Sequence, residues 1–151
     1  MDRDKEADVE SARGYDPQPD ILRSRFLVAG GYFSRAKIIL QSIVFANLVN
    51  KAYQTEYCLL MAKVALAERR TEDAIAFCNK AIALGRERKE HYAAEAALVA
   101  GIAAQQKNSS SQALQFWKMA TQIDGQGDVY IENIHKIAKQ KIAMANSGSP
   151  R

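Results

Sequence analysis

Few residues of this chain are of the types that bind metals or carry out acid–base catalysis. The two histidines, His91 and His135, lie far apart in the sequence. Each has few acidic or cysteine neighbours at the spacing of a metal site. We therefore expect two surface histidines and no bound metal.

The serine and glycine runs also lack the surroundings that catalysis or phosphate binding requires. The run of three serines from Ser109 has no histidine or acid placed to activate a nucleophile. Gln112, three residues after Ser109, instead predicts a capping box at the start of a helix. Gly30-Gly31 and the glycines at 125 and 127 do not form a phosphate-binding pattern and are expected to be turns. The sequence therefore predicts a protein that is not an enzyme and has no cofactor.

Charge is distributed unevenly along the 151 residues. Residues 1–20 hold seven acids and three bases, a net charge of −4, and residues 21–151 hold ten acids and eighteen bases, a net charge of +8. Because few apolar residues and two prolines (Pro17 and Pro19) occur in the acidic start, we expect residues 1–19 to be a flexible segment. The alternative is the remnant of an upstream helix. The bases of the remainder are not interleaved with aromatic residues, so nucleic acid is not expected as a partner.

Hydrophobic residues make up 48% of the chain, which is enough for a substantial core. The sequence contains no run of 18 apolar residues and no apolar segment directly after its charged first residues. We therefore expect no membrane insertion and a cytoplasmic location.

Residues 53–85 have the sequence pattern that most clearly predicts a helical hairpin. Apolar residues recur at helical spacing over 52–68 and again after Thr71, and only a few residues separate the two runs. The two helices must therefore be antiparallel. Thr71 is expected to be the N-cap of the second helix, and Gly85 its left-handed C-cap.

The same hairpin recurs before and after this stretch. Its marker alanines are Ala36, Ala74 and Ala113, so the two intervals between successive hairpins are nearly equal. Small residues twelve positions earlier, Ala62 and Gly101, allow two helix backbones to approach closely. Further helices are expected at residues 22–29, 32–45 and 90–106, then from the serine run to residue 123, and at 129–144. Residues 45–51 either extend a helix or form a loop.

On these residues the chain resembles the tetratricopeptide repeat family. The matching positions in the second and third units are Ala62, Ala74, Cys78 and Ala81, and Gly101, Ala113, Trp117 and Ala120. Residues 26–36 are also similar to repeats in the C-terminal part of longer bacterial members, so the chain is expected to be a section of a larger protein. The first unit fits least well, with Arg23 and Ser24 where a leucine and a small residue are usual.

The resemblance implies that the first helix of each repeat lines a groove that binds proteins or peptides. The residues at those positions would be Arg25, Val28, Glu56, Leu59, Lys63, Leu66, Glu95, Leu98, Ile102 and Gln105. They form an apolar strip with a few charges, which a partner helix or an extended peptide could bury. The alternative is that the strip packs within the chain, on upstream repeats or on a second copy.

The hairpin geometry makes two further predictions. Cys58 and Cys78 lie one turn from the close contact of the two helices, so we expect their Cα atoms to be about 4–8 Å apart, with both thiols buried and free. Trp117 should be buried between the two helices of its hairpin, near the last helix.

The sequence thus predicts an all-α, right-handed solenoid of three helix pairs over residues 20–145. Asp128 should cap a final helix that has one apolar face and closes the stack, and residues 146–151 should be a flexible tail. The expected function is that of a non-enzymatic scaffold or interaction module. The alternative is a purely structural section of a larger repeat protein.

Overall fold

The computed structural model describes residues 18–125 and 127–147 of the chain. Within these ranges it contains seven α-helices, one short 3-10 helix and no strand. The helices are α2 (Gln18–Ala29), α3 (Phe33–Ser42), η1 (Phe45–Asn47), α4 (Lys51–Ala67), α5 (Thr71–Gly85), α6 (His91–Gln106), α7 (Ser110–Gln122) and α8 (Val129–Ser147). The predicted all-α class is therefore confirmed. None of these helices is long and apolar enough to cross a membrane.

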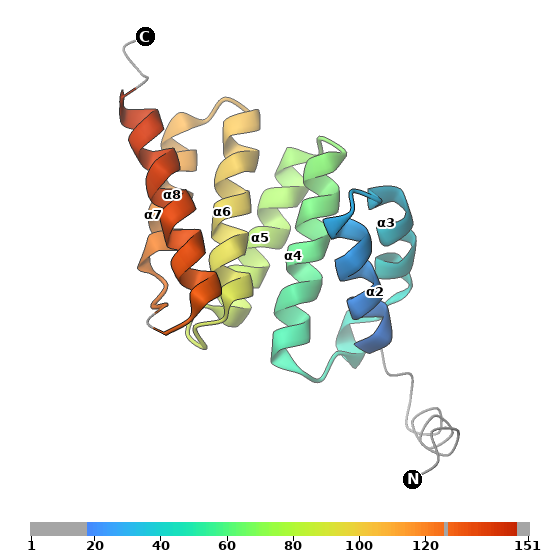
Figure 1. Cartoon of the computed structure of the whole chain (residues 1–151). Helices are drawn as coiled ribbons and strands as arrows, with labels where there is room; N and C mark the ends of the chain where they lie inside the picture. Colours follow the sequence, from blue (N-terminus) through green and yellow to red (C-terminus); the bar gives the residue numbers. More distant parts are fainter. Residues whose placement is uncertain (1–17, 126, 148–151) are drawn as a thin grey trace, which may run out of the picture.

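The helices form two rows (Figure 1). Each helix packs against the next one in the chain, which gives the hairpins α2–α3, α4–α5 and α6–α7. The first helices of the hairpins also pack on one another, α2 on α4 and α4 on α6, and α8 continues this row by packing on α6. We call the exposed surface of α2, α4 and α6 the first-helix face.

The turns inside the three hairpins have the same backbone structure. In each, one residue adopts the left-handed conformation: Gly31 (φ 83°), Arg69 (φ 61°) and Asn108 (φ 63°). The N–H of the residue after it donates to a carbonyl five residues earlier, at 2.8 Å, 2.9 Å and 2.9 Å. This bond is the signature of a Schellman cap at the end of a helix. Because the three turns follow one another at the same intervals as the marker alanines, the repeat spacing predicted from the sequence recurs in the backbone.

The small residues of the repeat are buried where the helices of each hairpin meet. Ala36, Ala74 and Ala113 are buried, as are the residues twelve positions before them: Ser24, Ala62 and Gly101. A Cβ atom added to Gly101 would lie 2.1 Å from Nε1 of Trp117. The glycine is therefore required by the indole ring that packs on it. Trp117 is buried with Lys141 of α8 above its ring, so its predicted place is confirmed.

Three of the predicted helix caps, at Gly85, Ser109 and Thr71, are wrong. Gly85 is the last residue of α5 and is not left-handed; the left-handed residue of that turn is Lys89 (φ 55°). Gly85 is needed instead for close packing, because an added Cβ would lie 2.9 Å from Cγ2 of Thr55. Ser109 is the N-cap of α7, but its side chain makes no capping hydrogen bond. The Schellman turn holds its ψ at 83°, short of the extended backbone that side-chain capping requires.

Helix ends also differ from the prediction by a few residues. Thr71 is the first residue of α5, and Arg70 is its N-cap. α3 ends at Ser42 rather than residue 45, since Ile43 and Val44 are extended and β-branched residues favour that backbone. The open segment after it contains η1. Asp128 caps α8 as predicted, accepting from Tyr130 N–H at 2.9 Å.

The two ends of the chain meet the expectations only in part. α2 begins at Gln18, four residues before the predicted start, and α8 runs to Ser147, so residues 146 and 147 of the predicted tail are helical. The rest of that tail, and residues 1–17 of the predicted acidic segment, lie outside the described residues. α8 buries Ile131, Ile134 and Ala138.

Candidate functional site

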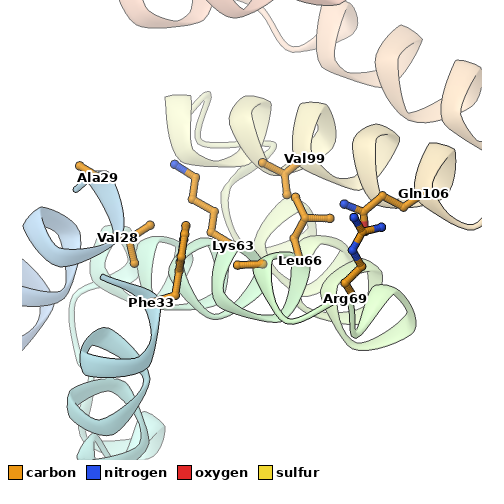
Figure 2. A pocket seen from close by; sticks show the side chains of 9 residues that line it. Val28, Ala29, Phe33, Lys63, Leu66, Arg69, Val99 and Gln106 are labelled. Atoms are coloured by element: carbon orange, nitrogen blue, oxygen red, sulfur yellow. The ribbon is translucent and has the colours of Figure 1, made fainter. Parts of the chain in front are cut away.

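The first-helix face contains two adjoining hollows. We call the first the ion-pair hollow; its volume is about 330 Å³. We call the second the apolar hollow; its volume is about 620 Å³ (Figure 2). The two share Val28, Ala29 and Lys63, so they form one continuous depression across α2, α4 and α6.

The ion-pair hollow is built around a buried carboxylate. Arg25 of α2 binds Glu56 of α4 through two hydrogen bonds, Nε to Oε2 at 2.5 Å and Nη2 to Oε1 at 2.8 Å. The Glu56 side chain is 2% exposed, and that of Arg25 is 41% exposed. The hydrogen bonds from Arg25 to Glu56 raise the pKa of the guanidinium above its ordinary value. The arginine therefore supplies both the charge and the hydrogen bonds that a buried carboxylate needs.

A second ion pair occupies the equivalent place one repeat later. Lys63 of α4 binds Glu95 of α6, and both side chains are 30% exposed. Lys63 follows Arg25, and Glu95 follows Glu56, at the same intervals that separate the hairpin turns. Ile102 of α6 and Ile134 of α8 occupy the corresponding positions one repeat further on, and both are apolar. One ion pair thus joins α2 to α4 and a second joins α4 to α6, whereas the corresponding positions of α6 and α8 hold apolar residues.

Aromatic side chains border the ion-pair hollow at the start of α6. His91 stacks on Tyr130 of α8, with ring centroids 4.9 Å apart, and also contacts Tyr92. Burial and the charge of Glu56 raise the pKa of Tyr92 to about 12. The hydroxyl group of Tyr92 is therefore neutral beside the carboxylate, and all three rings line the hollow.

Seven of the ten predicted groove residues line one or both hollows. They are Arg25, Val28, Glu56, Leu59, Lys63, Leu66 and Glu95. Leu98, Ile102 and Gln105 line neither. The structure therefore brings together the groove residues of the first two hairpins and Glu95 of the third, but not Leu98, Ile102 or Gln105.

The predicted apolar strip is partly covered within the chain. Leu59 and Leu98 are buried, while Leu66 and Ile102 are half-buried. The two buried leucines belong to the main core, together with alanines such as Ala62 and Ala97. Alanine keeps the first helices close to one another, so the leucines between them are covered. The surface left open at the ion-pair hollow is accordingly built from charged and aromatic side chains.

Several lining residues were not predicted. Phe33, Arg69, Val99 and Gln106 line the apolar hollow, and the aromatic border of the ion-pair hollow was also missed. One signal in the sequence could have found the ion pairs: the two bases, Arg25 and Lys63, are one repeat apart, and so are the two acids, Glu56 and Glu95. No comparable signal identifies Arg69, which lies in a turn.

The other residues considered for chemistry have structural surroundings. His135 is half-buried, with Nε2 at 2.7 Å from the Ile123 carbonyl oxygen. Cys58 and Cys78 are buried and free. Burial raises the pKa of Cys58 to about 11, and burial together with the charge of Cys58 raises the pKa of Cys78 to about 12. Their Cα separation stays a prediction.

Metal ligands do not gather in the part of the chain that the structure describes, where no group of three histidine, cysteine or acidic residues could hold an ion. Comparison with protein-family models, with curated proteins and with solved structures finds no match to this chain. The function therefore has to be inferred from the first-helix face itself.

Proposed function

We propose that this chain is a tetratricopeptide-like, right-handed solenoid that binds a protein segment on its first-helix face and catalyses no reaction. The observation that carries the proposal is the continuous depression across α2, α4 and α6, which contains seven residues expected to line a groove. Its mixture of apolar floor, aromatic border and a few polar groups is typical of binding sites. The three equivalent Schellman turns support the repeat architecture.

The charges of the ion-pair hollow favour binding over catalysis. Glu56 and Glu95 are each engaged by a base. An acid–base catalyst needs a titratable group that is free to exchange a proton with a substrate, whereas these carboxylates are held by cations. The pairs also recur at the repeat spacing, as expected if their role is to join successive first helices.

A second candidate function rests on the exposed side of α2. Leu22 is 44% exposed and Phe26 is 67% exposed. The residues one repeat later, Leu60 and Val64, are buried in the core cluster that α2, α3 and α4 form. The alternative is therefore that α2 stacks on a further helical hairpin, and that the chain is a structural section of a larger repeat protein.

Selection from a library of random twelve-residue peptides displayed on phage separates these two functions. The full chain is immobilised, and enriched peptides are measured against three variants. Leu66→Lys alters the apolar hollow, Phe26→Glu alters the exposed side of α2, and Ala76→Lys alters an exposed position of α5 as the matched control.

The proposed function predicts peptides whose affinity falls at least about tenfold with Leu66→Lys, because a charge then enters the apolar hollow. The other two variants should bind as the unaltered chain does. Peptides that respond only to Phe26→Glu would favour the stacking function. A selection that enriches no peptide, or only peptides indifferent to both Leu66→Lys and Phe26→Glu, would contradict the proposal.

A further inference from the structure

The apolar hollow has one polar end. Val28 and Phe33 lie at one end, Leu66 and Val99 line its middle, and Arg69 and Gln106 lie at the other end (Figure 2). Val28 and Val99 are buried, and Phe33 and Leu66 are half-buried. A ligand that follows the hollow therefore passes from an apolar surface to a guanidinium group.

Arg69 has no hydrogen bond or ion pair to its side chain among residues 18–125 and 127–147. The acid beside it in the chain, Glu68, is already bound by Lys37 at 3.2 Å and by Arg70 at 2.8 Å. The other base of the hollow, Lys63, is paired with Glu95. The hollow therefore carries one positive charge that no carboxylate of the described chain neutralises.

The backbone conformation of Arg69 is a second observation that points to a role for its charge. Arg69 is left-handed, like Gly31 and Asn108 in the equivalent turns. Glycine has no steric penalty in that conformation and asparagine adopts it more readily than most residues, whereas arginine has a Cβ clash to overcome. The second hairpin thus places a costly residue at a turn whose left-handed side chain itself lines the apolar hollow. Backbone strain of this kind is concentrated at functional sites.

We propose that the apolar hollow holds a large aliphatic or aromatic side chain of a protein partner, while Arg69 binds an aspartate or glutamate one to three residues away in the same segment. This inference rests on the proposed function and names the chemistry of the segment. A planar guanidinium can donate two hydrogen bonds to such a carboxylate. The volume of about 620 Å³ lies within the range of ligand-binding pockets.

The test uses the peptides that the library selection enriches on the full chain. They should share a large apolar residue with an acid within three positions. Replacing that acid by its amide should weaken binding to the unaltered chain about tenfold. It should weaken binding to the Arg69→Gly variant much less, because that variant lacks the guanidinium that binds the carboxylate. Affinities are measured by isothermal titration for all four combinations.

Arg69→Gly should also raise the melting temperature by a few degrees, since glycine relieves the left-handed turn. The loss of binding then cannot come from unfolding. Lys89→Gly is the matched control: Lys89 is left-handed in the turn after α5 and lines neither hollow. It should leave peptide affinity unchanged.

Three results would overturn the inference: enriched peptides without an acid, an equal effect of the amide on both proteins, or an equal loss of affinity with Lys89→Gly. In each case peptides that still respond to Leu66→Lys would leave the proposed function standing. Failure of the proposed function itself would appear earlier, as the absence of peptides that depend on Leu66.

Discussion

Within each hairpin the two helices meet through small and apolar residues, whereas successive first helices meet, in two of three contacts, through an ion pair. Inside the third hairpin, Trp117 packs on Gly101 with no room for a methyl group. Between first helices, the partly exposed Arg25 binds the buried Glu56, and Lys63 binds Glu95 where both side chains are partly exposed. The first kind of contact excludes water, and the second borders it.

The two kinds of contact contribute differently to the stability of the fold and to binding. Close packing inside a hairpin contributes through buried apolar area and dispersion contacts, which tolerate little change. Ion pairs at a half-open surface contribute less, but they hold adjacent helices in register and keep polar groups available beside the hollows. The hairpin interiors therefore build the fold, and the contacts between first helices shape the face that we propose to be functional.

The largest expected effect comes from emptying a hairpin interior. Trp117→Ala should reduce the free energy of unfolding by about 3–5 kcal/mol, because it removes a buried aromatic ring and leaves a cavity against Gly101. Urea denaturation followed by circular dichroism measures this. A loss below about 1 kcal/mol would show that the indole is not part of the tightly packed interior.

The two ion pairs should differ in strength because their burial differs. Arg25→Met leaves the buried carboxylate of Glu56 without its partner and should cost about 2–4 kcal/mol. Lys63→Met, the matched variant one repeat later, leaves a more open carboxylate and should cost at most about 1 kcal/mol. Both are measured by chemical denaturation at pH 7. Equal costs would mean that burial does not distinguish the two contacts.

The thiols inside the second hairpin predict a loss of stability in alkali. The pKa values of Cys58 and Cys78 rise on folding from an ordinary value of 9.0 to about 11 and about 12. Their contribution is thus complete below pH 9 and is lost as the pH rises toward those values, because only the unfolded chain ionises them. The free energy of unfolding should fall by about 2–3 kcal/mol between pH 8 and pH 10.

The variant carrying both Cys58→Ala and Cys78→Ala tests the origin of this dependence. Its denaturation curves at pH 8 and pH 10 should differ far less than those of the unaltered chain. The same alkaline loss in the double variant would assign the effect to other groups.

The smallest effect concerns the hydroxyl of Ser24. Ser24 is buried at the position of Ala62 and Gly101, and its Oγ has no hydrogen-bond partner in the described chain. Ser24→Ala should therefore raise the free energy of unfolding by about 1 kcal/mol, since the polar group no longer has to be buried. A decrease measured by thermal melting would indicate that the hydroxyl has a partner.

The sequence predicted the parts of the fold that depend on periodic burial. The marker residues Ala36, Ala74 and Ala113 located the three hairpins because small residues are required wherever two helices touch. The glycine cap at Gly85 and the capping box at Ser109 were wrong because a residue type suits several roles, and packing or a preceding turn decided between them. Residues 45–51 had no pattern that distinguishes a short 3-10 helix from a loop.

The candidate site was less predictable. Positions on first helices were found through the resemblance, but Leu59 and Leu98 are covered because neighbouring helices approach more closely than a pattern can show. Arg69 was missed because it belongs to a turn, and its place beside the apolar hollow depends on the packing of α2, α4 and α6. Side chains from four helices and one turn line that hollow, and no local stretch of sequence contains them.

The most direct test of the account is to map a library-selected peptide on the full chain by amide chemical-shift changes in NMR. Binding to the first-helix face predicts the largest changes at Val28, Lys63, Leu66 and Val99, with little change at exposed positions of the other row such as Ala76 and Gln115. Changes concentrated on Ala76 and Gln115, or around Leu22 and Phe26 on the exposed side of α2, would contradict it.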